Sequence, residues 1–123
     1  MKKLIVLFIA VVAIFCFSSC KKATPSDTVK GYYEALMKGD FEKAMTYTDI
    51  TDKEEIQQHI DKMKGCNLKV SEYEILSETL ADDGQSAVVA VKYTSSSSWS
   101  SKPSESNKTL DLVKKDGKWV IHE

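Results

Sequence analysis

The stretch TPSDTVKGYYEALMKGD, residues 24–40, decides the fold, because it predicts one long amphipathic helix with a defined start and end. Thr24 is a typical N-cap residue, and Pro25 suits the first helical position. Gly39 is placed to adopt the left-handed conformation that ends many helices. Between these limits, apolar residues recur at helical spacing and form one broad stripe: Val29, Tyr32, Tyr33, Leu36 and Met37.

Two shorter helices are predicted after this one. Asp40 can cap a short helix whose apolar face consists of Phe41, Ala44 and Met45. Thr51, followed three residues later by Glu54, matches a capping box and predicts a third helix that runs to about Lys64 and is closed by Gly65. This third helix would bury Ile56, Ile60 and Met63.

From Cys66 onward the pattern becomes that of extended strands. A first strand covers Leu68 to Leu76, and its apolar phase shifts near residues 74–76, which predicts a bulge. The sequence Asp82-Asp83-Gly84 is a hairpin turn signal. The next strand, residues 87–93, is apolar on both faces and is therefore predicted to be central.

The segment 94–108 allows two readings. Its serine run favours a solvated loop, as serine-rich stretches usually are. Alternatively, a strand through the serines would put Tyr93 and Trp99 on one face, with Ser95 and Ser97 between them, which suits the mouth of a ligand site.

Two further strands complete the chain, one with Leu110 and Leu112, the other with Trp119 and Ile121, joined by a tight turn at 116–117. Helices followed by an antiparallel meander predict an α+β fold, in which the N-terminal helices pack on a bent four-stranded sheet. We assign residues 25–123 to this single domain.

The first twenty residues, MKKLIVLFIAVVAIFCFSSC, have the order of a secretory signal: positive charge, an apolar run, then small residues. The cysteine at the expected cleavage point resembles a bacterial lipobox of the Ser-Ser-Cys kind found in Bacteroidetes. The resemblance implies that residues 1–19 are a lipoprotein signal peptide, that Cys20 carries the lipid (palmitate), and that 20–24 form the tether. An uncleaved anchor and a plain secreted chain are the alternatives; the apolar run Leu4–Phe17 is shorter than the roughly 20 residues that a spanning helix needs.

Composition limits the partners. The chain has 17 basic and 18 acidic residues, and two of the basic ones (Lys2 and Lys3) lie in the signal, so the mature balance is 15 against 18, a net charge of −3. This mildly acidic chain argues against nucleic acid as a partner. Of the three cysteines, Cys66 alone remains without an assigned role, so no disulfide is available inside the domain; we expect Cys66 to be a buried small hydrophobe, with pairing between chains as the alternative.

Four motifs together resemble the small lipoproteins of the nuclear-transport-factor-2-like superfamily: residues 24–27 (TPSD), 32–36 (YYEAL), 38–44 (KGDFEKA) and 116–119 (DGKW). The resemblance implies a cone in which a long helix lies across a bent sheet, often with a pocket between them. The superfamily contains isomerases, dehydratases, ligand binders and interaction domains, so the fold alone does not assign a function.

Candidate chemistry is sparse. Neither His59 nor His122 lies in a motif that would orient a general base, and we expect both to be solvated or packed at an edge. The residues His59, Cys66 and His122 are too scattered to predict a metal site, and no cofactor is expected. Asp111 alternates with Leu110 and Leu112, so it should be solvated if those leucines face the helix. The candidate pocket or mouth residues are Tyr32, Tyr33, Tyr93, Trp99, Asp111 and Trp119.

The sequence therefore predicts a lipoprotein held in the membrane through Cys20, in the outer membrane and facing the periplasm because Lys21-Lys22-Ala23 lacks the acidic residues associated with surface export. Its domain is expected to bind an unidentified protein or small molecule without catalysis. A pocket enzyme of the isomerase or dehydratase type is the alternative. A homodimer formed through the open sheet face is a third hypothesis, which requires an exposed apolar patch there.

Overall fold

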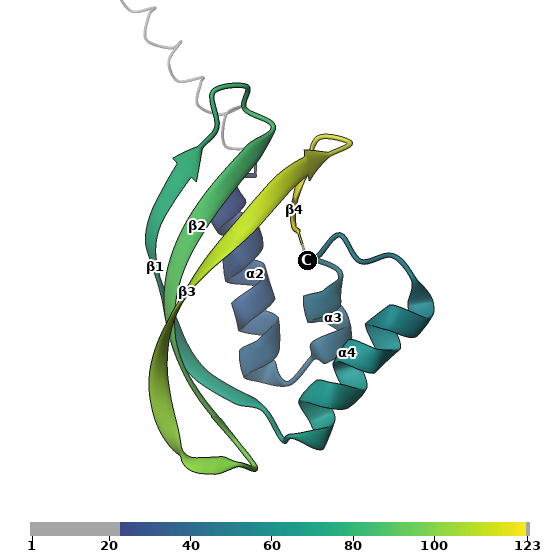
Figure 1. The fold of residues 1–123 in the computed structure, drawn as a ribbon, viewed down its shortest axis with the longest axis vertical. Coiled ribbons are helices and arrows are strands. Elements are labelled where there is room, and N and C mark those ends of the chain that lie inside the picture. The colour runs from purple at the N-terminus through teal and green to yellow at the C-terminus, as the bar shows by residue number, and fades with distance from the viewer. Residues whose placement is uncertain (1–22, 123) are drawn as a thin grey trace, which may run out of the picture.

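The computed structural model describes residues 23–122. In chain order its elements are α2 (Pro25–Lys38), α3 (Phe41–Met45), α4 (Lys53–Gly65), β1 (Lys69–Leu80), β2 (Ser86–Ser97), β3 (Ser100–Lys115) and β4 (Lys118–Ile121). The strands form one antiparallel sheet in the order β1-β2-β3-β4, and the helices pack against it (Figure 1). The predicted α+β class, with helices first and a four-stranded meander after them, is confirmed.

The predicted signal at 1–19 and the predicted lipid carrier Cys20 lie outside the described residues. No helix within residues 23–122 is both long enough and apolar enough to cross a membrane.

Helix α2 begins and ends where its sequence predicts. The Thr24 side chain accepts a hydrogen bond from the Asp27 amide, and the Asp27 carboxylate accepts one from the Thr24 amide, which completes a capping box. At the other end Gly39 has φ = 76°, and the amides of Gly39 and Asp40 donate to the carbonyls of Leu36 and Ala35 at 3.0 and 2.9 Å.

The start of α4 differs from the prediction by one residue. The N-cap is Asp52, whose carboxylate accepts a hydrogen bond from the Glu55 amide at 3.2 Å, rather than Thr51 with Glu54. Both pairs have the capping-box spacing, and an aspartate is at least as good an N-cap as a threonine. The helix also includes Gly65, and the left-handed residue after it is Asn67, with φ = 54°.

The sheet has the predicted bend and turns. The β1–β2 register shifts between Ile75 and Ser77, as the apolar phase predicts, and also between Val70 and Glu72. Gly84 and Gly117 both have positive φ, in the two predicted turns.

The loop predicted for 94–108 is wrong. Residues 94–97 continue β2 and 100–108 belong to β3, with Tyr93 opposite Ser106 and Ser95 opposite Ser104. The two polar segments satisfy each other's backbone groups as an antiparallel ladder, a pairing that composition alone does not reveal. Pro103 falls where the register shifts, so its missing N–H removes no regular ladder bond.

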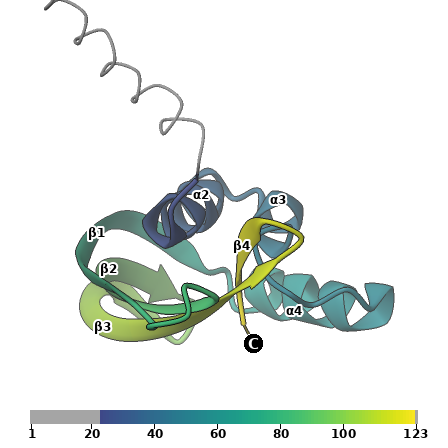
Figure 2. The ribbon, with the colours of Figure 1, turned by 90° about the horizontal axis from the view of Figure 1, so that it is seen from above.

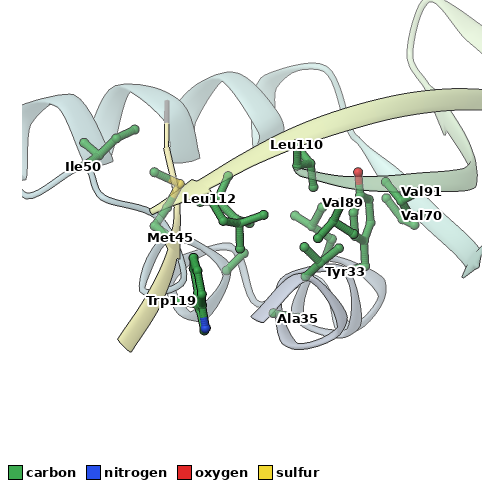
Figure 3. Packing of buried hydrophobic residues seen from close by; sticks show 14 of the residues in the cluster. Tyr33, Ala35, Met45, Ile50, Val70, Val89, Val91, Leu110, Leu112 and Trp119 are labelled. Carbon is green, nitrogen blue, oxygen red and sulfur yellow. The ribbon is translucent and has the colours of Figure 1, made fainter. Parts of the chain in front are cut away.

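Burial of α2 against the concave face of the sheet forms the core, and the sheet curls around this helix (Figure 2). Val29, Tyr33 and Leu36 of α2 are buried there. On the strands, every second residue points toward them: Ala87, Val89 and Val91 of β2, Leu110 and Leu112 of β3, and Trp119 and Ile121 of β4. Figure 3 shows how these apolar side chains meet between the helix and the strands.

Three polar contacts fix α2 along the sheet. Near the start of the helix, Ser26 donates to Glu78 Oε1 from its amide at 2.9 Å and from its hydroxyl at 2.6 Å. Two residues further, the buried Thr28 hydroxyl donates to the Trp119 carbonyl at 3.0 Å. Toward the other end, the Tyr73 hydroxyl donates to Glu34 Oε2 at 2.9 Å. The helix is thus held to β1 and β4 as well as packed on the sheet.

Gly31 lies inside α2, where glycine is normally unfavourable, because Tyr47 occupies the space beside it. A Cβ atom at residue 31 would lie 2.5 Å from Tyr47 Cζ, so the tyrosine ring would have to move. Gly65 has open space around it instead.

We expect Gly31→Ala to lower the free energy of unfolding by about 1–2 kcal/mol, because overpacking against Tyr47 outweighs the better helix propensity of alanine. In a Tyr47→Ala background, Gly31→Ala should raise the free energy of unfolding by up to about 1 kcal/mol. Gly65→Ala in the wild-type protein should raise it by a similar amount, because the space beside Gly65 is open. Urea denaturation of the four variants measures these values. A stabilising Gly31→Ala in the wild-type background would contradict the close contact.

Candidate functional site

A cavity of about 330 Å³ lies on the concave side of the sheet, between α2, α4 and the first three strands. Its aromatic lining is Tyr32 and Tyr33 from α2 and Tyr93 from β2. The rest of the lining consists of Leu36, Met45, His59, Met63, Leu68, Val70, Ser95 and Lys108. Its size is that of a small-ligand site, and its lining combines apolar side chains with the polar groups of the tyrosines, His59, Ser95 and Lys108.

Tyr33 is the centre of an aromatic cluster at this cavity. Its ring lies 5.3 Å from that of Tyr32, edge to face, and 5.4 Å from that of Tyr93, while Tyr73 stacks on it at 5.7 Å. Because Tyr33 is only 3% exposed, the cluster is rigidly held from inside the core. Three of the six predicted pocket residues, Tyr32, Tyr33 and Tyr93, therefore meet as expected.

The polar groups of the cavity come from positions to which sequence reasoning gave little weight. Lys108 lies opposite Val91 in the β2–β3 register and shares its face with Leu110 and Leu112, so it points to the concave side. His59, half-buried, lines the cavity from α4. Leu112, Leu110 and Lys108 are every second residue of one strand, so they point to the same face of the sheet. Lys108 was not predicted as a cavity residue because residues 94–108 were predicted to form a loop.

The other three predicted pocket residues do not reach this cavity. Trp99 is 86% exposed in the turn between β2 and β3, where no pocket wall surrounds it. Asp111 is exposed on the outer face of the sheet, opposite Val88, where the alternation with Leu110 and Leu112 puts it, and it does not line this cavity. Trp119 is buried at the other end of the concave side, where it lines a separate groove.

The two histidines differ in their contacts. His122 Nδ1 lies 2.6 Å from Asp49 Oδ2, a contact that joins the end of β4 to the segment after α3. It lies outside the cavity and closes the edge of the sheet, where Thr48 also bridges to Ile121. His59 has no hydrogen-bond or ion-pair partner among residues 23–122 to orient its ring as a general base would require.

Burial shapes the electrostatics of the tyrosine cluster. Burial first, then the neighbouring Tyr32 and Tyr93, raises the pKa of Tyr33 well above its usual range. Burial and the hydrogen bond to the Glu34 carboxylate raise the pKa of Tyr73 from 10.0 to about 12. Both hydroxyls thus stay neutral near neutral pH, and they can donate or accept hydrogen bonds but not act as bases.

Within residues 23–122, no three His, Cys, Asp or Glu side chains come close enough together to hold a metal ion. Cys66 is half-buried, and its thiol donates to the Met63 carbonyl at 3.6 Å. It is therefore less buried than predicted, because it caps α4 instead of lying in the core.

No family model and no curated protein matches the chain. Solved structures do match: a Shewanella oneidensis protein of unknown function, described as nuclear-transport-factor-2-like, has a TM-score of 0.60 at 18% identity, covering 80% of this chain and 98% of its own. A Campylobacter jejuni protein named as a nuclear-transport-factor-2-like transpeptidase has a TM-score of 0.53 at 22% identity, covering 82% and 99%. A Xanthomonas campestris protein named as a polyketide cyclase has a TM-score of 0.53 at 10% identity, covering 80% and 89%.

These similarities establish the nuclear-transport-factor-2-like cone fold. They extend to proteins that are named for different activities, so the fold alone assigns no function to this chain.

The raised tyrosine pKa values predict a loss of stability at alkaline pH. The folded pKa of Tyr73 lies above its unfolded value, so its contribution to stability is complete below pH 10.0 and is lost as the pH rises through about 12. In an ultraviolet titration of tyrosinate, Tyr33 and Tyr73 should remain protonated while the folded protein passes pH 10.0, and Tyr73 should ionise only near pH 12.

Glu34→Gln should lower the pKa of Tyr73, because it removes the carboxylate charge but keeps an acceptor. Tyr73→Phe identifies which part of the titration belongs to residue 73. Ionisation of all five tyrosines in one step near pH 10.0 by the folded protein would contradict the buried cluster.

Proposed function

We propose that the chain is an exported lipoprotein, anchored through acylated Cys20, whose cone domain binds a small ligand without catalysing a reaction. The cavity between α2, α4 and the sheet supports binding. Two features argue against a catalytic pocket: Asp111 points out of it, and no partner within residues 23–122 orients His59. The isomerase or dehydratase type of enzyme would need a proton-transfer group held inside the cavity.

The chemistry of the lining specifies the ligand class. Lys108 and His59 are its titratable nitrogen groups, and none of the described residues that line it is acidic. Three tyrosine rings and the side chains of Leu36, Met63 and Leu68 supply an apolar wall. Such a site favours a flat apolar body that carries one anionic group, with the ring against the tyrosines and the anion at Lys108.

We further propose that the lipid anchor lies in the outer membrane and that the domain faces the periplasm, since residues 21–23 carry no acidic group. The outer face of the sheet exposes Val88, whereas Leu80 is opposite Ala87, a residue of the concave face, and is exposed at the end of β1. Dimerisation through the sheet face stays a prediction.

Lipidation predicts a cysteine-specific result in cells. Cys20→Ala should abolish incorporation of labelled palmitate and remove the protein from the outer-membrane fraction, because the thiol is the acylation site. Cys16→Ala is the matched control and should leave both unchanged, since Cys16 lies within the predicted signal. Retention of both variants in the membrane without palmitate would identify the apolar segment as an uncleaved anchor and refute the proposal.

Ligand binding predicts a charge-specific result in calorimetry. The purified full-length protein in detergent should bind naphthoate more tightly than the neutral naphthalene carboxamide. Lys108→Met should weaken naphthoate binding by about fivefold, the value of one exposed ion pair of about 1 kcal/mol, and leave the amide unaffected. Lys108→Arg should preserve binding, and Lys102→Met, on an exposed part of the same strand, should change nothing. Equal binding of acid and amide, or no binding of either, would contradict the ligand class.

A further inference from the structure

A second groove, of about 720 Å³, lies at the end of the molecule where the described chain begins. Its wall includes Ala23 and Thr28 at the start of α2, Tyr47, and the β3–β4 hairpin with Lys114, Lys118 and Trp119. Figure 1 shows that the turns β1–β2 and β3–β4 are both at this end, while the turn between β2 and β3 is at the opposite end. The groove and the candidate ligand cavity therefore belong to different regions of the concave side.

The β3–β4 hairpin concentrates positive charge at the groove. Residues 114–118 contain three lysines and one aspartate, a balance of +2. Lys114 Nζ lies 5.5 Å from the centre of the Trp119 ring, so the indole holds this cation at the groove wall. Lys115 and Lys118 lie directly opposite each other in the register, an arrangement that is unfavourable without a counter-charge. Asp49 Oδ2 lies 4.0 Å from Lys115 Nζ, and no acidic residue is among the described residues that line the groove itself.

The predicted anchor would lie close to this groove. Ala23 is in the groove wall, and only three residue steps separate it from Cys20, a distance of at most about 10 Å along the chain. The two residues between them are Lys21 and Lys22. An acyl chain on Cys20 would therefore bring the β3–β4 hairpin to the level of the lipid headgroups.

We propose that the groove and the β3–β4 hairpin dock on an anionic phospholipid surface, with Lys114 and Lys118 contacting headgroup phosphates. This inference rests on the proposed lipidation of Cys20. The acidic β1–β2 turn, with Asp82 and Asp83, lies at the same end of the molecule, so repulsion there tilts the domain onto its β3–β4 side. The tilt fixes the orientation of the domain and leaves the ligand cavity, near the opposite end, accessible from the aqueous phase.

The two tryptophans provide the measurement, because Trp119 lines the groove and Trp99 lies in the distal turn. Trp99→Phe leaves Trp119 as the single tryptophan, and residue 99 is exposed, so this change should not disturb the fold. The full-length lipidated Trp99→Phe protein is reconstituted into vesicles that carry a nitroxide quencher on the phosphatidylcholine headgroup. One set is phosphatidylcholine alone and the other contains equal parts of phosphatidylcholine and phosphatidylglycerol.

We expect quenching of Trp119 to be about twofold stronger in the anionic vesicles and to fall to the neutral-vesicle level in high salt. Lys114→Glu with Lys118→Glu should remove this difference. The matched control is Lys69→Glu with Lys102→Glu, which changes the net charge equally, at positions near the distal turn, and should keep the difference. Each variant is compared with its own fluorescence in quencher-free vesicles, because Lys114 contacts the Trp119 ring.

Equal quenching in the two kinds of vesicle, or the same loss in both double variants, would overturn the docking face and show that the tether alone keeps the domain near the bilayer. Mass spectrometry of the reconstituted protein tests the premise separately. A chain without acyl mass on Cys20 refutes the proposed anchor, whereas an acylated chain without lipid-dependent quenching refutes only the docking face.

Discussion

The packing of one face of α2 on the concave side of the sheet is the interaction on which the rest of the structure depends. Val29, Tyr33 and Leu36 fill the middle of this interface, and contacts to Glu78, Trp119 and Tyr73 fix the helix along its length. If the helix rotated about its axis, Tyr33 would leave the core and the polar contacts would lose their partners. The orientation of this one helix thus determines which of its side chains meet the concave face of the sheet.

This central packing divides the concave side into two sites with different surroundings. Tyr33 lines the cavity toward α4, where the lining combines aromatic rings with Lys108 and His59. Trp119 lines the groove near the start of the helix, with Lys114 and Lys118. The same fold in other proteins carries different named activities, so the side chains that line these two hollows say more about function than the fold does.

Local signals made most of the fold predictable. Caps at Thr24 and Gly39, the turn glycines, and the alternation of residues 87–93 act over a few residues, so the sequence specifies them directly. The N-cap of α4 was ambiguous because Thr51 and Asp52 both have a glutamate at the right spacing. The strands through 94–108 depend on pairing between two polar segments, and the Asp49–His122 contact joins residues 73 positions apart. The tyrosines of the cavity were predicted, but Lys108 was not. The face of the sheet to which Lys108 belongs can be inferred only when the strand is known to extend through residue 108.

The two register shifts in β1 have a consequence for how the protein behaves at high local concentration. Strand β1 is the edge of the sheet, and a long, flat edge with free backbone groups would recruit the same strand from another copy. The irregularities near residues 71 and 76 interrupt that regular edge, and Lys69, Glu72, Glu74 and Glu78 place charges along it. Crowded molecules would therefore resist continuous sheet formation along this edge, and the bend that wraps the sheet around α2 also protects the chain from aggregation.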